Sequence, residues 1–491
     1  MGSFLTLEGR PLNAFSSKEH LTMSQVINDL KVEASHDEQA IDIDPVAEKR
    51  LIRKIDLYLM PSAFVLYLFS YVDRSNIGLA KIAGMEDDLN LSSNQYYIAV
   101  VIWVIGYTIG AVPSNMILAR TRPSIFIPVI TFGWGSMAAL IGIVQNQSQL
   151  IALRFFLGIF EAGFSVAIAH SIPSQPAVIF LISTWYRKGE QSKRFIIFLT
   201  AGILSGAFGS VVAGAITSTL DGVHGIRGWR WLFIVEGVAT AGISLIVHWT
   251  LLDYPHASRG LTTEEQDLAQ KRMVQDGGAE YVADSGQSIL SAFLKASCDW
   301  RTWLLVPAYM SILGALAISY FYPTLVDGMG YDATAAQYMT APIYLVSLGV
   351  ALPVCYFADQ RPHLRGKFLV ANLLVGMVFF ALTAGIQNYK ARYVFLCFIN
   401  MTIWTGNALG LSFSTTALAS VDRDVRAIML AMMNGVAALA QLYGSALFPA
   451  EDGPEYLVAF SVFAGTFAVG AVFYGLADFL FKRYPYEGRR G

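Results

Sequence analysis

Four ionisable side chains stand inside long apolar stretches of this sequence, where a charge is costly. Arg154 and Glu161 share one stretch and are seven positions apart. On a helix that spacing is two turns, about 10 Å along one face. Asp73 and Arg74 are adjacent and interrupt a second stretch. Because ionisable groups inside a membrane helix are rare and expensive, these four are candidate functional residues.

An arginine fork can bind a carboxylate through two parallel hydrogen bonds, so Arg74 in a cavity wall would hold a small anion. Asp73 beside it would partly neutralise Arg74 while no substrate is bound, or titrate. Glu161 feels burial, which favours its protonated form, and Arg154, which favours its charged form. A carboxylate balanced in this way can take a proton from one side of the membrane and release it to the other. Two other interpretations stay open: the helix ends at Asp73, or Arg154 and Glu161 form a structural pair that joins two helices.

The composition indicates a membrane protein. Of the 491 residues, 55% are hydrophobic and 14% are charged. Soluble proteins carry roughly 25% charged residues, so this chain has too few polar side chains to cover a globule in water. Lys+Arg 34 against Asp+Glu 36 leaves no basic excess for nucleic acid. We therefore expect the chain to lie in the lipid bilayer and not to bind nucleic acid.

Apolar segments of about 20 residues, the length that crosses a bilayer as a helix, recur along the chain. The expected spans are 55–82, 95–118, 124–145, 149–182, 195–217, 229–251, 302–326, 337–358, 367–386, 391–415, 426–447 and 457–481. Strands of a barrel would be half as long and would alternate, so the spans are helices. The predicted fold is an all-α membrane protein with twelve transmembrane helices in two six-helix bundles.

The predicted domains follow from these spans and from the charged stretch between the sixth and the seventh. They are a disordered cytosolic tail over 1–50, an N-terminal bundle over 51–252, a cytosolic central loop over 253–301, a C-terminal bundle over 302–482 and a cytosolic tail over 483–491. Lys and Arg are roughly threefold more frequent on the side of the two termini, which places both termini in the cytosol. Two sequons, at Asn90 and Asn146, then lie outside as candidate glycosylation sites.

Chemistry of other classes has little support in the sequence. None of the 7 histidines pairs with another at helical spacing, and the 3 cysteines are scattered. No phosphate-binding Gly-Lys-Ser/Thr loop occurs, which argues against an ATP-driven pump. We expect no enzyme activity, no cofactor and no metal. Two bundles that face each other across a cavity are instead typical of secondary transporters.

Polar and aromatic side chains of the second half are candidates to line such a cavity, although interfacial or core packing explains any one of them equally well. They are Tyr320, Tyr322, Trp404, Asn407 and Asn434.

Several motifs resemble the major facilitator superfamily, and within it the fungal anion:cation symporters that include the allantoate and nicotinate permeases. They are Asp73-Arg74-Ser75-Asn76-Ile77-Gly78, Val112-Pro113-Ser114-Asn115, Arg154 through Gly163, Trp185-Tyr186-Arg187-Lys188, Gly228-Trp229-Arg230-Trp231 with Glu236-Gly237, and Tyr322-Pro323-Thr324. The stretch with Asp359, Arg361 and Arg365 resembles the superfamily's loop motif between helices 8 and 9, whose charges latch the cytoplasmic gate. The resemblance covers about residues 50 to 485.

The resemblance implies proton-coupled uptake of a small carboxylate by a plasma-membrane carrier, which we expect to be monomeric. It implies that Arg74 binds the anion, that Asp73 and Glu161 exchange protons, and that Arg154 pairs with one of these two acids. The candidate substrate-binding residues are Arg74, Asn76, Arg154, Tyr322, Trp404 and Asn407. The alternatives are a proton-antiport exporter of a secondary metabolite or drug, and a non-transporting nutrient sensor.

This chain departs from the family pattern at two places. Ala111 stands where the family usually has an acidic residue. Residues 165–175 are inserted between Phe164 and Pro176, which makes the fourth expected span about 34 residues long, too long to cross a bilayer. An error in the gene sequence explains the insertion as well as a bulge or loop in helix 4 does.

Overall fold

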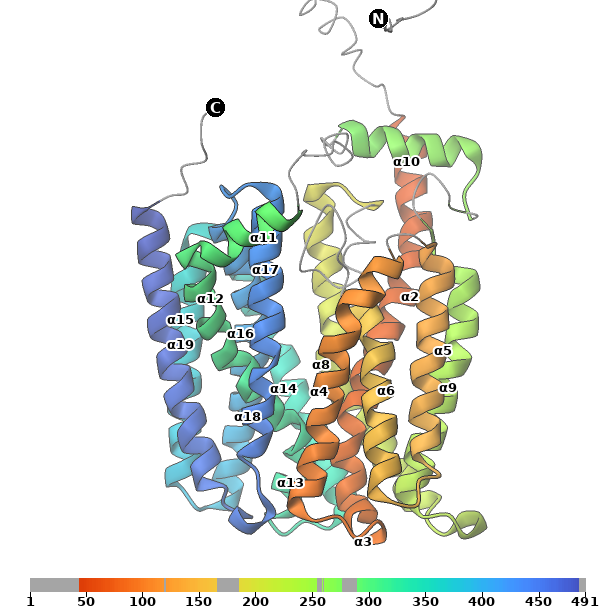
Figure 1. The fold of residues 1–491 in the computed structure, drawn as a ribbon, viewed down its shortest axis with the longest axis vertical. Helices are drawn as coiled ribbons and strands as arrows, with labels where there is room; N and C mark the ends of the chain where they lie inside the picture. The colour runs from red at the N-terminus through yellow and green to blue at the C-terminus, as the bar shows by residue number, and fades with distance from the viewer. Residues whose placement is uncertain are drawn as a thin grey trace, which may run out of the picture. The chain divides into compact units, whose positions relative to one another are not determined.

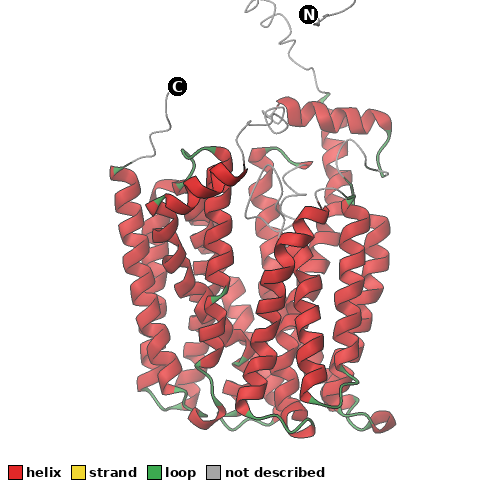
Figure 2. Ribbon diagram, viewed as in Figure 1, coloured by secondary structure: helices red, strands yellow, loops and turns green. Residues whose placement is uncertain are grey.

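The computed structural model describes residues 44–118, 121–165, 185–253, 258, 260–275 and 289–484, and every regular element within them is a helix (Figure 2). No strand occurs among these described residues. Lipid offers no hydrogen-bond partners to the backbone, and a helix pairs its backbone groups internally. A chain this apolar is therefore expected to be helical in a membrane. The prediction of an all-α membrane protein is confirmed.

The first half of the chain begins with a long helix that continues through a π-helical turn. The elements are α2 (Pro45–Ala80), η2 (Lys81–Met85), α3 (Glu86–Asp88), α4 (Ser93–Leu118), α5 (Pro123–Ile141), α6 (Gln147–Ser165), α8 (Lys188–Thr219), η3 (Val223–Gly225) and α9 (Gly228–Thr250). Two helices follow before the second half, α10 (Thr263–Gln275) and α11 (Ile289–Cys298).

The second half contains two helices that are broken along their length. Its elements are α12 (Trp300–Leu316), η5 (Ala317–Tyr320), α13 (Tyr322–Asp327), α14 (Ala333–Gln360), η6 (Pro362–Leu364), α15 (Arg365–Gly385), α16 (Tyr389–Ala417), α17 (Arg423–Ala438), α18 (Ala440–Ala446), η7 (Ala450–Asp452) and α19 (Leu457–Arg483). The expected seventh span was one helix over 302–326. It is instead α12, a 3-10 turn and α13, and the turn carries Tyr320.

Among the described residues, 10 helices are long and apolar enough to cross a membrane. Two more, α4 with 26 residues and α6 with 19, pack against each other, and α6 also packs against α5. Together they account for the twelve expected spans. The fourth expected span, 149–182, is described as a helix only as far as Ser165, so the rest of it and most of the 165–175 insertion lie outside the described residues.

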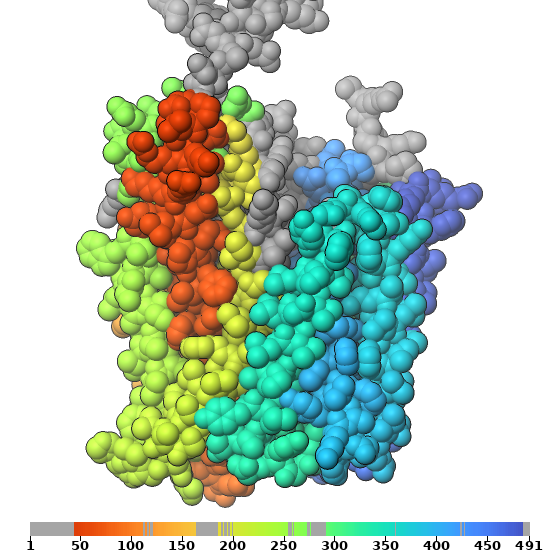
Figure 3. Space-filling view, turned by 180° about the vertical axis from the view of Figure 1, so that it is seen from behind, coloured from red at the N-terminus to blue at the C-terminus, as the bar shows by residue number. Residues whose placement is uncertain are grey.

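From Lys49 onward the chain forms one compact unit. Within it, α5 packs against α9 and α4 against α6 in the first half, while α15 packs against α19 and α14 against α16 in the second. The two groups of helices stand side by side (Figure 1), and α8 of the first packs along α14 of the second (Figure 3). The domain boundaries drawn from the sequence stay predictions, and the tail over 1–43 lies outside the described residues.

The end of this unit where α10 and α11 lie is called here the α10 end (Figure 1). There α10 is attached to the first group of helices. Lys54 Nζ of α2 lies 2.7 Å from Glu265 Oε2, and Arg272 Nη2 lies 2.9 Å from Glu190 Oε2 of α8. Partial burial disfavours the charged form of Glu265, but hydrogen bonds from Lys54 and Thr262 outweigh it and hold the pKa of that carboxyl below its usual range.

Hydrogen bonds join the two groups of helices at the opposite end. Gln337 of α14 donates to the Leu79 carbonyl of α2 at 3.1 Å and accepts from Thr217 of α8 at 2.6 Å. Tyr97 of α4 donates to the Leu442 carbonyl of α18 at 3.3 Å. The two groups of helices are therefore held together at the end away from α10.

Candidate functional site

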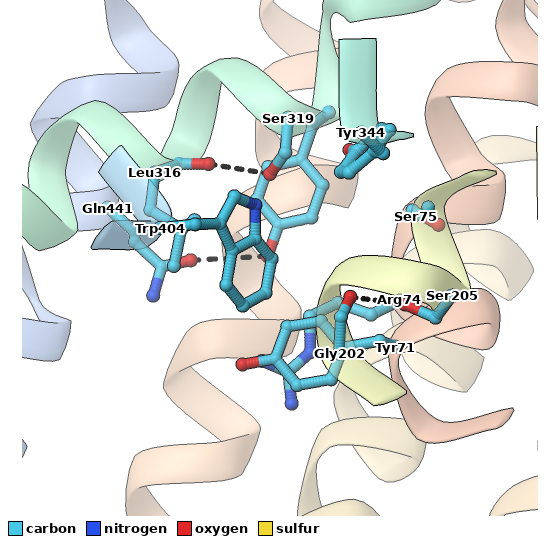
Figure 4. A pocket seen from close by; sticks show the side chains of 12 residues that line it. Tyr71, Arg74, Ser75, Gly202, Ser205, Leu316, Ser319, Tyr344, Trp404 and Gln441 are labelled. Atoms are coloured by element: carbon cyan, nitrogen blue, oxygen red, sulfur yellow. Dashed lines mark hydrogen bonds between the residues drawn. The ribbon is translucent and has the colours of Figure 1, made fainter. Parts of the chain in front are cut away.

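A cavity lies between the two groups of helices (Figure 4). Both halves of the chain supply its walls, from α2 and α8 on one side and from α12, η5, α14, α16 and α18 on the other. The lining residues are Tyr71, Arg74, Ser75, Gly202, Ser205, Gly206, Leu316, Ser319, Tyr320, Tyr344, Trp404 and Gln441.

Aromatic rings form much of the wall. The rings of Tyr71 and Trp404 face each other across the two halves, with centroids 5.6 Å apart. Tyr320 donates to Gln441 Oε1 at 3.2 Å, while Trp404 Nε1 has no hydrogen-bond partner within the described ranges. An unpaired indole N–H next to a cavity is a donor available to a ligand.

Arg74 lines this cavity because α2 continues through it. The helix runs without interruption to Ala80, so the alternative in which it ends at Asp73 is wrong. The Arg74 guanidinium carbon lies 4.2 Å from the Trp103 ring centroid and 4.5 Å from that of Tyr71. Its Nε has no hydrogen-bond partner, so the fork keeps an unused donor.

Glu161 is the ion-pair partner of Arg74, whose Nη2 lies 2.7 Å from Glu161 Oε1. The same carboxylate accepts from Ser70, and its other oxygen accepts from Trp103 Nε1 at 2.8 Å. Trp103 reaches Glu161 because α4 and α6 pack closely. Gly158 of α6 permits this approach, since a Cβ at that position would overlap the Trp103 carbonyl oxygen. These contacts from Arg74, Ser70 and Trp103 occupy both oxygens of the Glu161 carboxylate.

Arg154 does not pair with either acid, contrary to expectation. It is fully buried, and Nε donates to the Ala99 carbonyl of α4 at 3.2 Å, whereas Nη1 and Nη2 have no partner in the part of the chain that the structure describes. The reason is geometric. The seven-residue spacing separates Arg154 from Glu161 by about 10 Å along α6, and the oxygens of Glu161 are taken by residues of α2 and α4.

Asp73 and Asn76 point away from the cavity, although both were expected at or beside the substrate. Consecutive helical residues are turned by about 100°, so Asp73 cannot share the direction of Arg74. Asp73 instead accepts from Trp134 of α5 at 3.1 Å and from Thr240 of α9 at 3.0 Å. Asn76 donates to Glu236 of α9.

Two candidates of the second half also lie outside the cavity. Tyr322 is fully buried and donates to Asn400 Oδ1 at 3.2 Å, and Asn407 accepts from Tyr309. Both are parts of the packed second half. Of the six predicted substrate-binding residues, the structure brings Arg74 and Trp404 together at the cavity.

The expected gate motif lies where α14 passes into α15. Arg365 donates to Thr416 Oγ1 of α16 at 2.6 Å, and Arg361 is exposed. The Asp359 side chain lies outside those described. The sequon residues Asn90 and Asn146 are exposed and stand in loops at the end opposite α10.

Sequence reasoning missed several residues of these sites. Tyr71 lies one turn before Arg74 on the same helix face, and that spacing is a signal that was available. Glu236 is an ionisable residue inside an expected span, so the rule that singled out Glu161 applies to it too. Trp103 and Tyr344 carry no such signal, because their roles depend on contacts between helices.

Comparison of this sequence with known protein families and proteins identifies its relatives. Residues 63–449 match the Major Facilitator Superfamily. The MFS transporter prlL of Fungal sp. is 33% identical over 74% of this chain and 72% of its own length. The MFS-type transporter efuF of Hormonema carpetanum is 29% identical over 93% of this chain and 91% of its own.

Solved transporters share the fold. A bacterial homolog of the human lysosomal transporter Spinster, in an inward-facing and unoccupied conformation, has a TM-score of 0.64 at 16% identity, covering 87% of this chain and 98% of that one. The xylose transporter XylE from E. coli, in a partially occluded inward-open conformation, has a TM-score of 0.60 at 15% identity, covering 89% and 99%. The chain belongs to the major facilitator superfamily and is a multi-pass membrane transporter.

Proposed function

We propose that this transporter is a proton-coupled symporter that takes up a small organic anion, as a member of the anion:cation symporter family. The observation that carries the proposal is the ion pair at the cavity, in which the Arg74 guanidinium is held by Glu161 at 2.7 Å. The pair is formally neutral, and one of its members faces the cavity.

Competition between Glu161 and the substrate anion for Arg74 couples the movement of the anion to that of a proton. A proton on Glu161 cancels its charge and leaves Arg74 without a counter-ion. A substrate carboxylate then takes the place of Glu161 on the guanidinium fork, including the unused Nε. The occupied cavity has the same net charge as the empty one, so it can close around its cargo without burying a new charge.

Arg154 supports an anionic cargo. Its Nη1 and Nη2 have no partner among the described residues although the side chain is fully buried. Two guanidiniums against the single carboxylate of Glu161 leave one positive charge in excess beside the cavity, which favours a negative cargo.

The walls of the cavity favour a small anion with a planar group. The rings of Tyr71 and Trp404, whose centroids are 5.6 Å apart, offer faces on which such a group can stack. Nicotinate, a related pyridine carboxylate, allantoate and a vitamin-like acid each carry a carboxylate for one arginine fork in an aromatic cavity.

Transport would proceed by rocking of the bundle over 51–252 against that over 302–482 about the cavity. We propose that the α10 end is cytosolic, as the distribution of Lys and Arg favours. The contacts at the opposite end, including Gln337 with Leu79, then correspond to an inward-facing state. A monomer in the plasma membrane, with both termini in the cytosol and glycans at Asn90 and Asn146, completes this proposal.

Uptake of labelled carboxylates into cells that express the chain tests it. Nicotinate and allantoate are the first probes, with and without a protonophore. We expect uptake that collapses with the proton gradient and that is lost in Arg74→Ala. Arg122→Ala, which removes an exposed arginine from the loop before α5, is the matched control and should transport normally.

Three outcomes contradict the proposal. Concentrative uptake by Arg74→Ala refutes the role of the guanidinium, and uptake that ignores the protonophore refutes proton coupling. If deletion of the gene sensitises cells to a toxin while carboxylate uptake is unchanged, the chain is an exporter.

A further inference from the structure

A second group of polar side chains is buried between α2, α5 and α9, separate from the central cavity. Its acids are Asp73 of α2 and Glu236 of α9, with exposed fractions of 2% and 3%. Neither they nor their hydrogen-bond partners line the cavity. No part of the exchange between Arg74 and a substrate anion uses Glu236.

The two acids are interleaved across the contact of α2 with α9. Asn76, about one turn after Asp73, donates to Glu236, and Thr240, about one turn after Glu236, donates to Asp73 at 3.0 Å. Close packing of α5 on α9 adds a third donor, Trp134, at 3.1 Å from Asp73. This approach requires Gly237, since a Cβ there would overlap the backbone of α5.

This group of side chains contains more hydrogen-bond acceptors than donors. Asp73 Oδ1, Glu236 Oε1 and Asn76 Oδ1 are all buried without a donor among the described residues. Asn76 is fully buried, and its amide is aimed at Glu236 by the hydrogen bond of its nitrogen. Three unsatisfied acceptors in one buried cluster indicate a missing hydrogen-bond donor, and a proton on a carboxyl group is the smallest that fits between packed helices.

Among the residues that the structure describes, no cation forms an ion pair with either acid. On α2, Arg74 is turned to Glu161, and α5 contributes only the indole of Trp134. On α6, Arg154 donates to the Ala99 carbonyl, and Glu161 is itself negative. The described part of these helices therefore contains two positive groups, Arg74 and Arg154, and three carboxyl groups.

From this arrangement we propose that Asp73 and Glu236 share one proton, and that this pair is a second proton-carrying site of the transporter. One proton on the pair brings the summed charge of five ionisable groups to zero, namely Asp73, Arg74, Arg154, Glu161 and Glu236. Loss of that proton leaves two like charges close together in a medium of low dielectric, so the pair must be reprotonated before the cycle continues. The inference rests on the proposed proton-coupled function and adds Glu236 to it.

Two proton sites have a measurable consequence. If Glu161 and the Asp73–Glu236 pair each carry one proton, a monovalent anion enters with two protons and net positive charge moves inward. Glu236→Gln removes one proton from the cycle, so its uptake becomes electroneutral. The accumulation ratio then falls about tenfold for each unit of pH difference across the membrane, since each coupled proton contributes one factor of ten.

The test uses the full chain reconstituted in vesicles with labelled nicotinate, or with whichever carboxylate the uptake screen identifies. We expect uptake by the unaltered chain to depend on membrane potential, and uptake by Glu236→Gln not to. Exchange at equal pH on both sides needs no net proton movement and should survive in Glu236→Gln. Glu264→Gln, the same change at an exposed position of α10, should remain potential-dependent.

The outcomes separate this inference from the function on which it rests. If the unaltered chain ignores the proton gradient, the proposed function fails. If it is proton-driven but electroneutral, or if Glu236→Gln keeps full potential dependence, only the second site is refuted. Loss of exchange together with accumulation in Glu236→Gln means a structural role and also refutes it.

Infrared spectroscopy gives a readout without transport. The purified chain should show the absorption of a protonated carboxyl at neutral pH, and Glu236→Gln should lose it. If Glu236→Gln does not reach the membrane, Asp73→Asn is measured instead. Absence of this absorption in the unaltered chain overturns the proposal.

Discussion

Replacing Glu161 by glutamine tests the charge exchange at the cavity most directly. Glutamine keeps the size of the side chain but carries no charge, and its single amide oxygen can accept from Ser70 or from Trp103, which now donate to different oxygens of Glu161. Arg74 then keeps its aromatic neighbours and loses its ion-pair partner at 2.7 Å. The variant resembles the protonated state of Glu161 at every pH.

The magnitudes follow from the burial of the pair. Glu161 is 1% exposed and Arg74 12%, and removal of one partner from such a pair costs about 3–5 kcal/mol of stability. The empty variant should therefore unfold at a lower temperature than the unaltered chain. An anion that binds Arg74 should restore much of this loss, because binding to the folded state stabilises it by mass action.

Binding should also lose its pH dependence. If the anion binds to the unaltered chain together with one proton, as the exchange requires, its apparent Kd rises by at most about tenfold, or about 1.4 kcal/mol, for each pH unit. In Glu161→Gln the fork is always free, so the apparent Kd should stay flat.

Equilibrium binding of labelled nicotinate to the chain in lipid nanodiscs, from mildly acidic to neutral pH, measures both slopes. Glu264→Gln is the control and should follow the unaltered chain. A tenfold slope that persists in Glu161→Gln would refute the exchange of proton and anion at this pair. Unchanged binding after a further Arg74→Ala change would show that the fork is not the anion site.

Three smaller changes test the surroundings of the site. Trp404→Ala removes a ring of the cavity wall and should raise the KM for nicotinate about tenfold in uptake assays, whereas Trp404→Phe should recover part of the loss. Gly78→Ala places a methyl group against the backbone of η5, so uptake should fall steeply, while Gly349→Ala, with open space around it, should transport normally. Lys54→Ala should loosen α10 by less than about 1 kcal/mol, seen as faster hydrogen exchange, because exposed pairs are weak. The folded-state pKa of Glu265 is lowered, so its contact with Lys54 stabilises the attachment of α10 at neutral pH and is lost as the pH falls through that pKa. In acid, α10 of the unaltered chain should therefore loosen, whereas α10 of Lys54→Ala should change less.

The sequence alone was sufficient for the class of protein, for most of the helical spans and for singling out Arg74 and Glu161, which form an ion pair beside the cavity. Apolar segments of the right length and few charges leave helices in lipid as the stable solution, whatever the details of packing. The same scarcity made Arg74 and Glu161 conspicuous, because a buried charge is expensive wherever it lies along a helix. These properties depend on local composition, which a sequence states directly.

Only the tertiary structure decided which charged groups meet. Arg154 and Glu161 share a helix face in the sequence, yet Glu161 pairs with Arg74 of another helix, because close packing of α4 and α6 turns its carboxylate toward α2. Asp73 and Arg74 are neighbours in the sequence but serve two separate sites, since adjacent helical residues point in different directions. Their partners come from far along the chain. The charges of the first bundle could be counted from the sequence, but their division into a cavity pair and a buried acid pair is a result of packing.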